Sequence, residues 1–232
     1  MKKTTILGIL VGMFIGLQSQ DIPIGAWRTH FAGRLAKTGA LVKNEIFVGC
    51  QMGLYSYNLD TKTYKTYSKS DGISGYQLNK IVMDSTSGNL ILTYADGNID
   101  FYKNGSFTNI PDFFNYDFSG SKATNHINVS KGIAYISTNA GLLLININNM
   151  EVKETYSYIG PNASLVSVLS SAVKEDSLFI STNQGIMVGK LSPAVNLQNY
   201  NKWKMVPGSG TGGSIISFGG KIYTIINNQV HT

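Results

Sequence analysis

The pattern of apolar and polar residues along this chain repeats. Apolar runs of about five residues occur at 46–50, 90–94, 134–138 and 178–182, each followed by a short polar turn, a glycine and a second apolar or alternating run. The glycines stand at positions 53, 97, 141 and 185, which is the same 44-residue spacing three times. Such a unit predicts a β-hairpin, because glycine tolerates a positive φ near the turn. A fifth copy follows at 222–230, with Gln229 where the glycine would fall.

Two more strands are expected around each hairpin. The preceding strands are predicted at 39–42, 80–83, 126–129, 166–169 and 214–217, and the following ones at 63–67, 106–110, 152–156 and 203–206. Four short strands in each period are typical of a propeller blade. We therefore predict an all-β fold, a β-propeller with four-stranded blades of about 44 residues. A sandwich or a solenoid also has regular turns, but neither accounts for a four-strand period.

The N-terminus predicts export. Lys2 and Lys3 precede an apolar run at 6–17, which has the length of a signal-peptide core and is too short to span a bilayer comfortably. Ser19 suits the position before a cleavage site. We predict a signal peptide at 1–19 and propeller blades over 20–232, comprising four full blades and the start of a fifth. No transmembrane segment is expected after removal of the signal peptide, and the unfinished fifth copy suggests an incomplete fragment of a larger propeller protein.

Composition narrows the function classes. The chain is 43% hydrophobic and 14% charged, which suits an ordered globular protein. Its net charge of +6 comes from scattered lysines and arginines, whereas a nucleic-acid site needs clustered ones. We therefore expect no nucleic-acid partner. Cys50 is the single cysteine, so no intrachain disulfide is possible, and its place in an apolar run predicts a small buried residue.

The segment that most resembles a metal-binding loop is 94–100. Asp96, Asn98 and Asp100 have the alternate spacing that opens a calcium loop, but such a loop needs glycine at its sixth position and an acid at its twelfth. Both of those positions hold phenylalanine. Because Gly97 aligns with the other repeat glycines, we interpret the segment and its acids as a structural turn.

Catalytic chemistry has no clear sequence signal. His30, His126 and His231 lie far apart and have no metal-ligand spacing. We predict no catalytic, cofactor-binding or metal-binding residue.

One loop stands out as a candidate contact patch. Four aromatic residues lie close together within 112–124, namely Phe113, Phe114, Tyr116 and Phe118. Such a group either forms a small packed cluster beneath its loop or an exposed surface for a partner. Packing is the favoured outcome of the two.

Several segments resemble known propeller repeats. The loop S-K-S-D-G-I-S at 68–74, followed by L-N-K-I at 78–81 and G-N-L at 88–90, resembles the D-G-L-S unit of two-component-regulator propellers. With the segments at 24–30, 94–100, 110–112 and 153–160 in this order, the chain is similar to the PorZ-like N-terminal propellers of type IX secretion systems, from about residue 22 onward.

This resemblance implies an exported, non-enzymatic interaction module at the surface of a Bacteroidetes-type bacterium. The implied partners are a PorU-like sortase, which cleaves and attaches cargo, and an anionic lipopolysaccharide bound through regions not in this chain. The alternative is the extracytoplasmic sensor propeller of a hybrid two-component regulator. A propeller enzyme is a third hypothesis, and it would need a cluster of carboxylates or histidines at the channel mouth.

Overall fold

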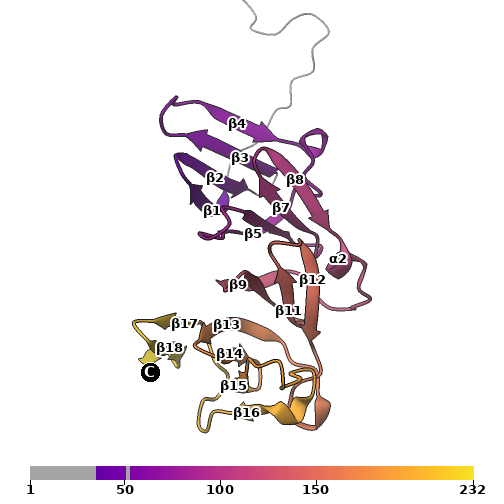
Figure 1. Cartoon of the computed structure of the whole chain (residues 1–232), viewed down its shortest axis with the longest axis vertical. Coiled ribbons are helices and arrows are strands. Elements are labelled where there is room, and N and C mark those ends of the chain that lie inside the picture. Colours follow the sequence, from indigo (N-terminus) through magenta and orange to yellow (C-terminus); the bar gives the residue numbers. More distant parts are fainter. Residues whose placement is uncertain (1–34, 51–52) are drawn as a thin grey trace, which may run out of the picture. The chain divides into compact units, whose positions relative to one another are not determined.

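The computed structural model describes residues 35–50 and 53–232. The predicted signal peptide at 1–19 and His30 lie outside these residues. Within them the chain forms consecutive antiparallel sheets, four of them with four strands and one with three (Figure 1). None of the helices in this part of the chain has the length and apolar character needed to span a bilayer.

Each sheet is a meander in which successive strands pair. Blade 1 comprises β1 (Ala36–Val42), β2 (Glu45–Cys50), β3 (Gly53–Asn58) and β4 (Tyr64–Tyr67). Blade 2 comprises β5 (Leu78–Met83), β6 (Leu90–Tyr94), β7 (Ile99–Lys103) and β8 (Ser106–Ile110). Blade 3 comprises β9 (Thr124–Ser130), β10 (Ile133–Thr138), β11 (Gly141–Asn146) and β12 (Glu151–Tyr156). Blade 4 comprises β13 (Val168–Lys174), β14 (Ser177–Thr182), β15 (Gly185–Lys190) and β16 (Trp203–Met205). Blade 5 comprises β17 (Ile215–Phe218), β18 (Lys221–Ile226) and β19 (Gln229–His231).

The helices of the described residues are single turns in the connections. They are η1 (Lys69–Asp71), α2 (Asp112–Asn115), η2 (Pro161–Ala163) and η3 (Tyr200–Lys202). The all-β prediction with four-stranded blades is confirmed.

The repeat glycines have the positive φ that the pattern predicts. Their φ angles are 143° at Gly53, 94° at Gly97, 119° at Gly141 and 128° at Gly185. A side chain is also excluded at Gly141, because a Cβ there would collide with the carbonyl oxygen of Tyr156. In blade 5 the hairpin needs no glycine. Asn227 and Asn228 adopt φ angles of 51° and 60° instead, and asparagine tolerates this conformation better than most residues.

One strand departs from its predicted position. The first strand of blade 4 was expected at 166–169 but runs from Val168 to Lys174. Its middle, Ser170 to Ala172, is buried although two of its three residues are serines. Val166 is fully buried in the preceding connection, so its apolar character reflects packing outside the strand.

Apolar cores lie between neighbouring blades. Strand β6 shows why its sequence is an unbroken apolar run. Leu90, Leu92 and Tyr94 belong to a cluster shared with blade 1, and Ile91 belongs to one shared with blade 3. A strand buried on both faces loses the alternation of a half-exposed strand. Similar clusters join blades 3 and 4 and blades 4 and 5.

Hydrogen bonds between first strands also join the blades. The Ile81 amide of blade 2 donates to Thr38 Oγ1 of blade 1 over 2.9 Å. The Ile215 amide of blade 5 donates to Ser170 Oγ of blade 4 over 3.2 Å. First strands of neighbouring blades are thus in direct contact, which is the arrangement of strands around a propeller axis.

Candidate functional site

The connections between blades and the turns after each second strand lie on one side of the sheets, because successive strands are antiparallel. We call this side the loop face. It comprises connections 68–77, 111–123, 157–167 and 206–214 and turns 95–98, 139–140, 183–184 and 227–228. Hydrogen bonds join the two kinds of segment. Gln184 Nε2 donates to the Leu165 carbonyl over 3.2 Å, and Ser167 Oγ donates to Asn139 Oδ1 over 2.9 Å.

The first connection of the loop face contains the D-G-I-S motif, and each of its residues has a structural role. Asp71 accepts a hydrogen bond from the Ser68 amide at 2.9 Å and so caps the turn η1. Gly72 has a φ of 104°, and Ile73 is buried. Ser74 donates both its amide and its hydroxyl to Asp100, over 2.8 and 2.6 Å. The motif therefore fastens the connection to strand β7.

Asp100 is fully buried, and the protein supplies four donors to its carboxylate. Besides the two groups of Ser74, Tyr94 donates its hydroxyl over 2.6 Å and Asn109 its Nδ2 over 2.9 Å. Burial, followed by the negative charge of Asp100, raises the pKa of the Tyr94 hydroxyl above its ordinary value. The carboxylate thus holds the connection before blade 2 and two strands of that blade together.

This role was not foreseen from the sequence, which suggested that all the acids of 94–100 belong to a turn. Asp96 does so, since its Oδ1 accepts from the Asn98 amide at 3.0 Å. Asp100 lies within β7 and faces inward. Its signal in the sequence is a single acid between Ile99 and Phe101 in an apolar stretch, 26 residues after the motif serine. Across residues 35–50 and 53–232, no three His, Cys, Asp or Glu side chains gather as potential metal ligands.

The four aromatic residues of the second connection have different surroundings. Phe113 is buried against the apolar cluster of blades 2 and 3, and Phe118 packs partly against the same cluster. Phe114 and Tyr116 are 45% and 40% exposed. Lys122 fixes the path of the connection by donating to the Phe114 carbonyl over 2.7 Å. The loop therefore has a packed base and two outward-facing rings.

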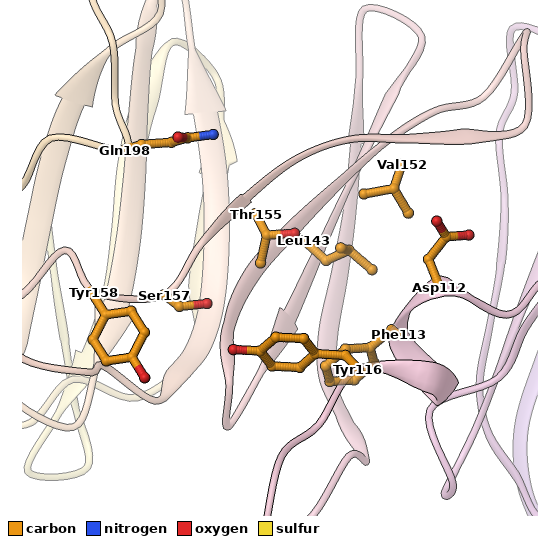
Figure 2. A pocket seen from close by; sticks show the side chains of 9 residues that line it. All are labelled: Asp112, Phe113, Tyr116, Leu143, Val152, Thr155, Ser157, Tyr158 and Gln198. Atoms are coloured by element: carbon orange, nitrogen blue, oxygen red, sulfur yellow. The ribbon is translucent and has the colours of Figure 1, made fainter.

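A cleft of about 550 Å³ opens beside this loop (Figure 2). Its lining comes from the second and third connections, from the outer strands of blade 3 and from the segment between β15 and β16 of blade 4, namely Asp112, Phe113, Tyr116, Leu143, Val152, Thr155, Ser157, Tyr158 and Gln198. The Phe113 and Tyr116 rings are stacked, with centroids 6.3 Å apart. Tyr158 is 59% exposed. Aromatic rings with a few polar groups in a concave surface are typical of a binding site.

The remaining sequence candidates lie away from this cleft. His126 lies in β9, where its Nδ1 accepts from the Ser171 amide of blade 4 at 3.5 Å. Burial, and then the charge of Lys80, lowers the pKa of this imidazole. His231 is exposed in β19. Cys50 is buried, and burial raises the pKa of its thiol, which disfavours the reactive thiolate.

Comparison of the sequence with models of protein families identifies the family of this chain. The model of the PorZ N-terminal β-propeller domain, from the type IX secretion system, matches residues 46–204. The chain belongs to the PorZ N-terminal β-propeller family. The match begins in β2 and ends in β16, so it covers the cleft and all of its lining residues.

Solved structures agree on the propeller fold. PorZ of Porphyromonas gingivalis, an essential bacterial surface component of the type IX secretion system, superposes with a TM-score of 0.77 and 22% identity over 87% of this chain. The extracellular domain of BT4673 from B. thetaiotaomicron, a putative one-component system, gives a TM-score of 0.62 and 16% identity over 90% of this chain. The chain spans 27% and 28% of these two proteins' chains.

Among curated proteins, a stretch of 98 residues is 31% identical to the eukaryotic translation initiation factor 2-alpha kinase PK4 of Plasmodium berghei. The match covers 41% of this chain and 4% of that protein. These shares are too small to indicate a common function.

Proposed function

We propose that the chain is an exported, non-enzymatic interaction module of a type IX secretion system. It acts at the periplasmic or outer side of the outer membrane, beside a PorU-like sortase that processes and anchors cargo. The observation that carries the proposal is the family match over residues 46–204. The order of the D-G-I-S loop and its neighbouring motifs along the chain supports it.

The loop face is the part of the molecule best suited to this role. It presents exposed aromatic rings on the ends of paired strands, and it supplies Asp112, Phe113, Tyr116, Ser157 and Tyr158 to the lining of the cleft. Binding residues are often carried by loops that a rigid scaffold holds in place. We propose that residues 1–19 direct export and are removed, and that the propeller then binds its protein partner through this face. Any contact with anionic lipopolysaccharide is assigned to regions not in this chain.

The test is deletion of the gene in its host, followed by measurement of type IX cargo on the cell surface by immunoblotting of surface fractions. We expect unprocessed cargo to accumulate and surface display to fall. Complementation with Tyr116→Ala plus Tyr158→Ala should restore display incompletely. Tyr64→Ala is the matched control, because Tyr64 is 71% exposed but lies in β4, away from the cleft. Normal cargo processing in the deletion strain would overturn the proposal.

A sensor propeller is the second candidate, and the likeness to the extracellular domain of BT4673, which a further solved structure describes as a putative hybrid two component system, favours it. A hybrid regulator must carry its signal across a membrane to a kinase. This candidate therefore requires a transmembrane helix and a histidine-kinase region further along the same open reading frame. Sequencing the complete gene decides between the two candidates.

A further inference from the structure

Exposed tyrosines recur in successive connections of the loop face. Tyr76, Tyr116 and Tyr158 lie in the first, second and third connections and are 45%, 40% and 59% exposed. The face of a tyrosine ring is weakly negative and attracts cations. Tyr76 already has one, because Lys69 Nζ lies 5.6 Å from the centroid of its ring. The other cation–π contact among residues 35–50 and 53–232 is Lys65 over Tyr67, so the rings of Tyr116 and Tyr158 have no cation from the described chain.

The loop face is also negative in a chain that is basic overall. Its connections and turns carry two lysines, Lys69 and Lys122, against four aspartates at 71, 96, 112 and 117. Both lysines are engaged within the chain, Lys69 over Tyr76 and Lys122 with the Phe114 carbonyl. The net charge of the whole chain is +6. A cationic partner is therefore attracted to this face more than to the rest of the surface.

The cleft concentrates these features. Its lining includes the carboxylate of Asp112 and no lysine or arginine. Within the described residues the Asp112 carboxylate forms neither a hydrogen bond nor an ion pair, whereas the carboxylates of Asp71 and Asp96 accept hydrogen bonds in turns. In the view of Figure 2 the Tyr116 ring lies between Tyr158 and Asp112. Tyr116, Tyr158 and Asp112 line the same cleft, so a flat cation stacked on Tyr116 would share the cleft with a second exposed ring and a carboxylate.

A guanidinium group fits this combination. It is planar, stacks on aromatic rings and can donate two parallel hydrogen bonds to a carboxylate, while the more strongly hydrated ammonium of lysine does neither as well. The hydroxyls of Thr155 and Ser157 and the amide of Gln198 offer further acceptors along the cleft. An anionic saccharide would instead meet the charge of Asp112 with no basic group to offset it.

We propose that this cleft binds an arginine side chain carried by an extended segment of the protein partner. The inference rests on the proposed function, because it takes the ligand to be a protein. Tyr116 and Tyr158 contact the guanidinium and its methylene stem, and Asp112 accepts its hydrogen bonds. Neutral saccharides also stack on tyrosine, so they are the competing class of ligand that the experiment must separate.

The probe is the blocked tripeptide acetyl-Ser-Arg-Ser-amide, titrated into the whole chain and followed by NMR of ¹³C-labelled tyrosine rings. The control probe replaces arginine by citrulline, which has nearly the same shape but no charge. We expect the arginine peptide to shift the Tyr116 and Tyr158 signals in a saturable way and the citrulline peptide to bind about tenfold more weakly. Asp112→Asn should lower the affinity for the arginine peptide by a similar factor, and Tyr116→Ala should lower it by about threefold.

Two matched variants control for general effects of substitution in this loop. Asp117→Asn removes an exposed acid that does not line the cleft, and Phe114→Ala removes an exposed ring that does not line it. Both should bind the arginine peptide like the unchanged chain. Equal binding of the arginine and citrulline peptides would overturn the proposal. So would equal losses in Asp112→Asn and Asp117→Asn, or saturation of the same tyrosine signals by a neutral oligosaccharide such as maltopentaose but not by the arginine peptide.

The outcome is separable from that of the cargo experiment. If gene deletion leaves cargo display normal while the arginine peptide binds as expected, the secretion role fails and the arginine site stands. If deletion abolishes display while the two peptides bind alike, the secretion role stands and the arginine site fails.

Discussion

Ser74 and Asp100 are joined by two hydrogen bonds, one from the serine amide and one from its hydroxyl. The pair links a connection on the loop face to the buried strand β7. It gives the D-G-I-S motif a physical explanation, since the serine follows the capped turn η1 and supplies two donors to a buried carboxylate.

Replacing Asp100 by alanine should destabilise the protein strongly. The change leaves the Ser74 amide and the Tyr94 hydroxyl without their acceptor in a buried site, and each unsatisfied donor costs about 1–3 kcal/mol. We expect a loss of about 3 kcal/mol or more in the free energy of unfolding, measured by urea titration. Asp117→Ala, at an exposed acid, should change it by no more than about 0.5 kcal/mol. Similar midpoints for the two variants would contradict the role given to Asp100.

Alanine should be tolerated very differently at two glycines of blade 3. At Gly141 it combines a φ of 119° with a collision against the Tyr156 carbonyl, so we expect a loss of more than about 3 kcal/mol. Gly132 has a φ of 75°, and its nearest neighbour to an added Cβ is the Asn148 side chain at 3.8 Å. Alanine at Gly132 should therefore lower the free energy of unfolding by only about 1 kcal/mol. Thermal unfolding of both variants measures the difference, and equal costs would mean that the collision is relieved by movement of the backbone.

Within the aromatic loop, Phe113 and Phe114 should separate stability from binding. Phe113→Ala removes a buried ring and should cost about 3–5 kcal/mol of unfolding free energy. Phe114→Ala removes an exposed ring and should cost little. Denaturant unfolding of the two single variants tests the assignment, which fails if the exposed position proves the more costly one.

Stability should depend on pH through His126. Its pKa in the folded protein is lowered by burial and by Lys80, so the unfolded chain binds the proton more readily. The stability that the neutral imidazole contributes is fully present above its pKa in the unfolded chain, which is about 6.5. It is lost as the pH falls toward the lower pKa of the folded protein. A protonated Nδ1 would also stop accepting from the Ser171 amide. His126→Gln should remove this part of the loss between pH 7.5 and pH 5, as measured by urea midpoints at the two values. An unchanged pH dependence in that variant would assign the effect to other groups.

Much of the fold follows from the period of 44 residues. The hairpin glycines locate the second and third strands of four blades, because their positive φ disfavours other residues there. At Gly141 the close Tyr156 carbonyl excludes a side chain as well. The shift of β13 shows the limit of the pattern, since serines that are buried between blades do not look apolar in a sequence. The role of Asp100 was missed because its hydrogen-bond partners are distant in the sequence. They come from a connection, a neighbouring strand and the outer strand of the blade.

The cleft is harder to foresee. Its residues come from segments around 112–116, 143–158 and 198, and only the packing of blades 3 and 4 brings them together. The cluster of aromatic residues at 113–118, which the sequence singled out, does supply two lining residues of the cleft, Phe113 and Tyr116. Which of its rings face outward depends on the path of the connection, which the bond from Lys122 to the Phe114 carbonyl helps to set.

The separate apolar clusters between blades have a consequence for how the molecule comes apart. Each cluster joins only two neighbouring sheets, so the free energy of the array is close to a sum of nearest-neighbour terms, as in other repeat proteins. Such an array can open locally, one junction at a time, and its blades then behave as distinct cooperative units in hydrogen exchange. The cleft lies over blade 3, whose junctions on both sides hold large buried clusters. Its walls are therefore expected to persist after the junction between blades 4 and 5, with its small cluster, has begun to fray.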